Sequence, residues 1–179
     1  MAFIPPEFAG YAEKDPGFAL AMTKHLYGDP SYPGANRPEL WADGPKVQFV
    51  NRNLTFTDVP ATPGANTSEQ VHDLGGGRNY ILFGRSVTVL GSTARTAQLP
   101  NQDTDFINYQ EEVLFGRAIV EEGPLSIVFG STPAFPYALF RPELGFGGML
   151  RRYTLENNTG TVVSSVILGF QLALLDTGR

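Results

Sequence analysis

Apolar and polar residues alternate along two long runs in the C-terminal part of the chain. One run places an apolar side chain at every second position, the set being Val166, Leu168, Phe170, Leu172 and Leu174. In residues 149–156, Tyr153 and Leu155 alternate with polar residues. Because successive side chains of a strand point to opposite faces, both runs predict strands with one buried face. Residues 161–175 are predicted to be the central and most buried strand, joined to residues 149–156 by a hairpin turn at residues 157–160.

Shorter alternating runs precede these two. The further predicted strands cover residues 46–50, 53–59 and 79–91, residues 107–123 and 124–130 hold two or three more, and residues 70–74 are a candidate edge strand. Within them, Ile81, Phe83, Val87 and Val89 share the parity of a buried face, and residues 121–124 predict a tight turn. About eight to ten strands result, with no strong helical pattern after the first quarter of the chain. The pattern predicts an all-β fold, a jelly-roll-like β-sandwich.

Two predicted strands share the letters Leu-Phe-Gly-Arg, at residues 82–85 and 114–117. As an internal repeat, the glycine would permit a bulge and the arginine would face outward. With only two copies, chance similarity between strands is the preferred interpretation.

Residues 1–45 differ from the rest, since they hold seven of the fourteen prolines and many aromatic residues. An extended segment of this kind cannot form its own core, so it is expected to pack across its own domain or on a neighbour. One short helix is predicted at residues 16–27, with Asp15 as N-cap, Pro16 in the first position and Gly28 after the end. We therefore predict an N-terminal arm, residues 1–45, followed by a sandwich domain, residues 46–179.

The amino-acid composition restricts the classes of function that the chain can have. Charged residues are only 17% of the chain, against roughly 25% in typical domains. Either partner subunits cover much of the surface, or the surface is rich in Thr, Asn and Ser; composition does not separate the two. The net charge of −5 disfavours nucleic-acid binding, because phosphate neutralisation requires clustered Lys and Arg.

The chain has no cysteine, which excludes disulfides and cysteine-ligated metals. Its first residues lack the features of a signal peptide, and no run of about 20 apolar residues occurs. We expect a chain that is made in a cytoplasm and has no segment that spans a membrane.

Candidate chemistry is sparse. Neither His25 nor His72 has the spacing of a catalytic triad or zinc site, so both are expected at a surface or interface. The glycines of residues 75–77 lack a phosphate-loop pattern and predict a turn. The acidic pairs at residues 111–112 and 121–122 place their members on opposite strand faces and are interpreted as solvated charges that protect sheet edges. A calcium site is disfavoured, because the EF-hand positions are lacking; its ligands would be Asn101, Asp103, Asp105 and Asn108.

The arginines offer a clearer signal. Arg is preferred over Lys where planar, bidentate pairing joins subunits, and the chain holds only three lysines. Arg141, Glu143, Arg151 and Arg152 are therefore candidate interface residues. Pairing of Arg141 with a Glu of its own domain is an equally good interpretation.

The segments FPYALFRPELGFGGMLRRYTLENNTG and VILGFQLAL, residues 135–160 and 166–174, resemble the small β-sandwich virion proteins of tailed bacteriophages. The resemblance implies a structural subunit, of the capsid decoration (cement) or minor capsid type. It covers about a quarter of the chain.

We therefore expect a non-enzymatic virion subunit on the capsid surface that binds the major capsid protein or other virion subunits. It is expected to form a homo-oligomer, with a trimer as one candidate. No catalytic, cofactor-binding or metal-binding residue is predicted. The arm residues expected at interfaces are Phe3, Phe8, Tyr11 and Trp41.

Two alternatives stay open. The first is a fibre, tail-tip or head-spike module that binds host-surface glycan through Tyr109, Tyr137 and Trp41. The second is a metal-dependent sandwich-fold enzyme, which the two distant histidines disfavour.

Overall fold

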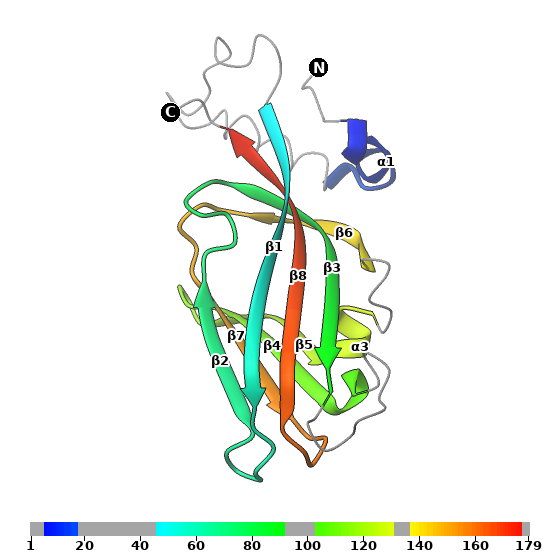
Figure 1. Cartoon of the computed structure of the whole chain (residues 1–179). Coiled ribbons are helices and arrows are strands. Elements are labelled where there is room, and N and C mark those ends of the chain that lie inside the picture. Colours follow the sequence, from blue (N-terminus) through cyan, green and yellow to red (C-terminus); the bar gives the residue numbers. More distant parts are fainter. Residues whose placement is uncertain (1–5, 18–45, 92–102, 131–136, 177–179) are drawn as a thin grey trace.

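Eight strands form two antiparallel four-stranded sheets, packed as a sandwich (Figure 1). The structure, a computed structural model, describes residues 6–17, 46–91, 103–130 and 137–176. The strands are β1 Lys46–Val59, β2 Thr67–His72, β3 Tyr80–Leu90, β4 Ile107–Val113, β5 Ala118–Pro124, β6 Tyr137–Gly145, β7 Arg151–Asn157 and β8 Val163–Asp176. The helical elements are α1 Pro6–Lys14, the 3-10 turn η2 Thr104–Phe106 and the short α3 Leu125–Val128. The predicted β-sandwich is confirmed.

The strand pairing is nested. β1 pairs with β8, β2 with β7, β3 with β6 and β4 with β5. Further pairs of β3 with β8 and β4 with β7 give the sheet orders β1-β8-β3-β6 and β2-β7-β4-β5. Such pairing is a long hairpin rolled up into two sheets, which is the jelly roll.

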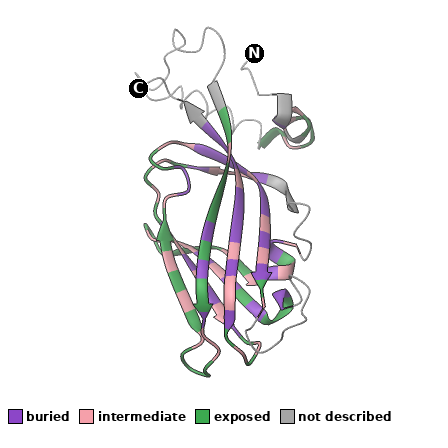
Figure 2. Ribbon diagram, viewed as in Figure 1, coloured by how far each residue is buried: buried purple, intermediate pink, exposed green. Residues whose placement is uncertain are grey.

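The core lies between the sheets, and β8 runs through the middle of its own sheet. The alternating residues of β8, from Val166 to Leu174, are all fully buried (Figure 2). They pack with residues of the opposite sheet such as Tyr153 and Leu155. The prediction of a central, most buried C-terminal strand is confirmed.

The predicted hairpin between the last two strands is wrong. β7 and β8 lie in different sheets, so residues 158–162 connect one sheet with the other. Asn157 is buried at this crossing, where its side-chain amide donates to the carbonyl oxygens of Val59 (3.1 Å) and Thr161 (2.9 Å). An Asn-rich turn between alternating strands fits either arrangement, so the sequence pattern did not distinguish them.

Gly84 marks a bulge, which was expected only under the less favoured interpretation of Leu-Phe-Gly-Arg as an internal repeat. The register of β3 with both neighbours shifts between Leu82 and Gly84. Because one inserted residue reverses the parity of the residues after it, Leu82 and Arg85 both lie inside the sandwich. The predicted outward direction of Arg85 is therefore wrong, as is the grouping of Phe83 with the core face.

The second Leu-Phe-Gly-Arg copy has a different structure. Residues 114–117 form the turn between β4 and β5, and Arg117 has a positive φ of 50°. Residues 121–124, predicted as a turn, belong to strand β5, and α3 replaces part of the strand predicted at residues 124–130. The likeness of the two segments is therefore one of sequence alone.

At the N-terminal end, α1 packs beside the sandwich, although the sequence pattern predicted no helix there. Phe8 is 2% exposed, and its ring lies edge-on to that of Phe83 at a centroid distance of 6.2 Å. Pro16 and Gly17 have helical backbone, while the rest of the helix predicted at residues 16–27 lies outside the described residues. Strand β1 begins at Lys46, as predicted. Among the described helices, none is both long and apolar enough to cross a membrane.

Candidate functional site

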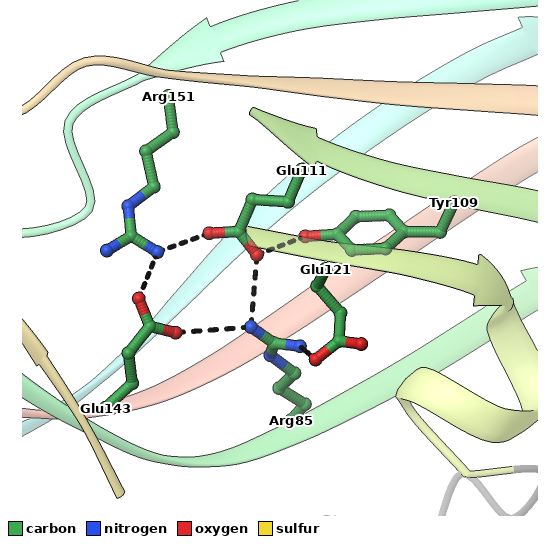
Figure 3. Close-up of polar contacts among 6 residues, drawn as sticks. All are labelled: Arg85, Tyr109, Glu111, Glu121, Glu143 and Arg151. Carbon is green, nitrogen blue, oxygen red and sulfur yellow. Dashed lines mark hydrogen bonds and ion pairs between the residues drawn. The ribbon is translucent and has the colours of Figure 1, made fainter. Parts of the chain in front are cut away.

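Five charged side chains meet inside the sandwich, at the point where the β3 bulge turns Arg85 inward (Figure 3). Glu111 of β4 accepts from the guanidinium groups of both Arg85 (3.0 Å) and Arg151. Glu143 of β6 pairs with the same two arginines, 3.4 Å from Arg85. Glu121 of β5 contacts Arg85 at 3.3 Å. We call these five residues the interior ion cluster; it joins the two sheets.

The centre of the cluster is fully enclosed. Glu111 is 0% exposed and both arginine side chains are 2% exposed, whereas Glu143 and Glu121 lie toward the rim. The hydroxyl of Tyr109 donates to Glu111 Oε2 at 2.8 Å. Two carboxylates, Glu111 and Glu143, therefore balance two buried cations.

Aromatic rings complete the walls. The guanidinium of Arg85 lies 5.7 Å from the ring centroid of Phe129, and that of Arg151 lies 5.7 Å from the ring of Tyr80. Burial alone would lower the pKa of Arg85, but Glu111 and the other acidic neighbours raise it, and the net pKa is raised. Burial raises the pKa of Tyr109, and the charge of Glu111 raises it further. Burial would also lower the pKa of Arg151, but Glu143 and Glu111 outweigh this effect, so that the net pKa is raised. Both arginines are therefore cations and Tyr109 is a neutral donor.

Glu143 makes stability depend on pH. Burial raises its pKa; Arg151 and Arg85 lower it and Glu111 raises it, so that the net pKa lies above its usual value of 4.5. Because the folded chain then holds this proton more tightly than the unfolded chain, the contribution of Glu143 to stability rises as the pH falls from neutral toward 4.5. This contribution is lost as the pH rises through the folded pKa.

We expect the difference in unfolding free energy between the wild type and Glu143→Gln to shift in favour of the wild type as the pH falls over this range. The amide introduced by the substitution cannot take up the proton that stabilises the wild type. Urea unfolding at a series of pH values measures the shift, with Glu112→Gln on the outer face of β4 as the control. Parallel pH curves for wild type and Glu143→Gln, or a shift in the opposite direction, would contradict this assignment.

The interface residues predicted from sequence fall into three groups. Phe3 and Trp41 lie outside the described residues, and for Tyr11 and Arg141 only the backbone, in α1 and β6, is described. Phe8 is buried against its own sandwich. Its ring is therefore already covered within one chain.

The remaining three belong to ion pairs within the chain. Arg151 is buried in the interior ion cluster, so its predicted role in pairing between subunits is wrong, and Glu143 has the same two arginine partners. Arg152 points the other way, to the outer face of β7, where it is 42% exposed and lies 3.4 Å from Glu112. Arg151 and Arg152, which are adjacent in β7, thus point to opposite faces of the sheet.

Glu111 also corrects the interpretation of the acidic pairs. It was expected to be a solvated charge at a sheet edge, but β4 lies between β7 and β5 and Glu111 is buried. Glu111 alternates in step with Ile107 and Tyr109, which are both fully buried, and this parity is the sequence signal that could have predicted its buried position. The opposite faces predicted for Glu111 and Glu112 are confirmed, because Glu112 pairs with Arg152.

The other candidate sites are structural. The glycine-rich turn at residues 75–77 is held by Asp73, whose carboxylate accepts from the N–H groups of Gly75 (3.0 Å), Gly77 (2.6 Å) and Gly148 (2.9 Å). These donors are therefore occupied by the chain itself. His72 is exposed, as predicted, and its ring contacts Gln70, whereas His25 lies outside the described residues.

The residues that the sequence suggested for calcium binding and for glycan binding do not form such sites among the described residues. Asp103 is buried and Asn101 is outside the described residues; among those described, no three His, Cys, Asp or Glu are placed to share a metal ion. Tyr109 is 1% exposed, so it cannot offer its ring to a glycan as predicted. Of Tyr137 only the backbone is described, and Trp41 lies outside.

Comparison with models of known protein families gave no match, and comparison with curated proteins gave none either.

Proposed function

We propose that the chain is a non-enzymatic structural subunit of a phage virion, a capsid decoration (cement) or minor capsid protein that binds and stabilises the head. The nested pairing of its eight strands carries this proposal, because the eight-stranded jelly roll recurs in viral capsid proteins. Since a fold hosts many functions, the surfaces and the interior of this chain must also fit a structural role.

The interior ion cluster fits such a role. Its cations are 2% exposed and are paired with Glu111, Glu121 and Glu143. Charges that neutralise one another between β3 and β6 of one sheet and β4, β5 and β7 of the other hold the two sheets together. The buried charges of the cluster therefore need no ligand or partner from outside the chain to neutralise them.

One end of the second sheet offers a surface for a neighbouring subunit. β5 is an edge strand, with backbone groups open to a partner. Exposed apolar side chains lie on it and beside it: Phe115 (93% exposed), Ile119 (56%), Val120 (38%) and Leu150 (49%). Leu150 belongs to this group because its carbonyl oxygen accepts from the N–H of Leu114 at 3.1 Å, next to Phe115. We call these four residues the β5 apolar surface, and contact with another virion subunit would remove it from water.

Analysis of purified particles tests the proposal. Virions of the phage that encodes this chain should contain it in many copies, and particles made without it should release DNA at a lower temperature. Mass spectrometry of gradient-purified virions and a thermal DNA-release assay measure the two effects. Absence of the chain from virions would overturn the proposal.

Phe115→Ser should weaken attachment of the purified chain to heads that lack it. Complete burial of a phenylalanine contributes roughly 1.5–3 kcal/mol, so we expect binding to weaken by about tenfold to a hundredfold. Phe106→Ser is the matched control, because Phe106 is also exposed (57%) but precedes β4, whereas Phe115 follows it. Equal binding by the two variants would exclude the β5 apolar surface as the contact.

A further inference from the structure

A groove of about 340 Å³ lies on the outer face of the second sheet. Its polar lining comes from all four strands of that sheet: Thr67, Asn108, Gln110, Glu122, Thr154 and Glu156. Tyr109 and Leu155 point into the core, so the neighbouring Asn108, Thr154 and Glu156 face outward. The volume is at the lower end of that of small-molecule sites, about 300–1,000 Å³.

The register of the strands brings these side chains side by side. Thr67 is opposite Glu156, and Glu156 is opposite Asn108. In the next row Thr154 is opposite Gln110, which is opposite Glu122. Because adjacent strands lie about 4.8 Å apart, each row presents polar groups at a regular spacing on a rigid support.

The chemistry of the lining is mixed. The two amides and two hydroxyls can each donate and accept, and the two carboxylates accept. Asn108 donates to Glu156 at 3.1 Å, which orients both side chains. In the part of the chain that the structure describes, the side chains of Gln110, Glu122 and Thr154 have no hydrogen-bond partner, so they are open to a ligand.

Only one class of ligand matches this set. An anion would be repelled by Glu122 and Glu156, and an apolar ligand would leave the polar groups unpaired, which is unfavourable. A cation would use the two carboxylates but give no acceptor to the amide N–H groups of Gln110. A neutral molecule with many hydroxyl groups donates to the carboxylates and accepts from the amides and threonines at once.

We propose that this groove binds a short neutral saccharide through hydrogen bonds from the faces of β4, β5 and β7. The inference goes beyond the proposed structural function and does not depend on it, because binding is measured with the isolated chain. No aromatic side chain provides a stacking surface among the residues that line the groove, since the ring of Tyr109 is buried in the core. We therefore expect affinities in the millimolar to micromolar range.

A glycan array of neutral mono- to oligosaccharides, followed by saturation-transfer NMR with the hits, tests the proposal on the full chain. Thr154→Val and Gln110→Ala should each weaken binding by about tenfold, since each removes one hydrogen-bonding group. Thr88→Val is the matched control: Thr88 is a half-buried threonine on β3, in the other sheet. Unchanged melting temperatures of the three variants show that their folds are intact.

Saccharide binding that Thr154→Val and Gln110→Ala weaken and Thr88→Val preserves would support the proposal. If no neutral saccharide binds at millimolar concentration, or if all three variants bind alike, the proposal is overturned. Binding of trilysine in place of saccharides would overturn it as well, because it would identify the groove as a cation site.

Discussion

Replacing Glu111 with Gln should lower the free energy of unfolding by about 3–5 kcal/mol, as expected when one partner of a buried ion pair is removed. Glu111 is 0% exposed and pairs with both Arg85 and Arg151, each 2% exposed. Without its charge, the two buried cations keep only Glu143 and, at the rim, Glu121, which contacts Arg85. Such a loss is a large part of the roughly 5–15 kcal/mol that stabilises a typical domain. Urea or thermal unfolding measures the change.

Glu112→Gln is the control for this substitution. Glu112 is the next residue of the same strand, yet its ion pair with Arg152 is partly exposed, at 20% and 42% respectively. Exposed pairs contribute at most about 1 kcal/mol, so Glu112→Gln should change stability little. A loss of the same size in both variants would show that β4 is sensitive to any substitution and that the interior ion cluster has no special role.

Asn157→Asp is expected to destabilise the fold by at least about 3 kcal/mol at neutral pH. The Asn157 amide, 1% exposed, donates to the carbonyl oxygens of Val59 and Thr161. A carboxylate has no hydrogen to donate, so it would place a buried negative charge against two carbonyl oxygens. The loss should shrink as the pH falls, because protonation of the introduced carboxylate restores one donor.

Asn158→Asp is the control for Asn157→Asp, because it introduces the same charge at the neighbouring, exposed position. Asn158 is exposed, and its side-chain oxygen accepts from Asn66 at 3.0 Å, a role that a carboxylate oxygen also fills. We expect its unfolding free energy to stay close to that of the wild type. If Asn157→Asp were equally well tolerated, or if its loss did not change with pH, the buried amide would not be what holds the crossing between the sheets.

Local alternation was sufficient to predict the sandwich and most of its strands, since it reports which side of a strand is buried, but it did not predict β6. It also predicted that β8 is central, because β8 carries the longest apolar stripe. The turn at residues 157–160 shows the limit of that signal. A strand with one buried face has the same pattern whether the next strand pairs beside it or crosses to the opposite sheet.

The interior ion cluster was missed for a different reason. Arg85, Glu111, Glu143 and Arg151 come from β3, β4, β6 and β7, so their proximity depends on how the two sheets pack. In addition, charged side chains are expected at the protein surface unless a specific signal places them in the core. Only parity with buried neighbours marked Glu111, Arg151 and Arg85 as internal, Arg85 through Val87 and Val89, and the bulge at Gly84 reversed that signal for Phe83.

The nested pairing of the strands has a consequence for biosynthesis. β8 is the last of the eight strands to leave the ribosome, yet β1 and β3 both pair with it in the finished sheet. Until then the nascent chain carries β1 and β3 without the strand that separates them, and contacts between residues so distant in sequence form slowly. Their open edges can meanwhile pair with other chains. High-level expression should therefore depend on chaperones or low temperature more strongly than the stability of the finished fold suggests.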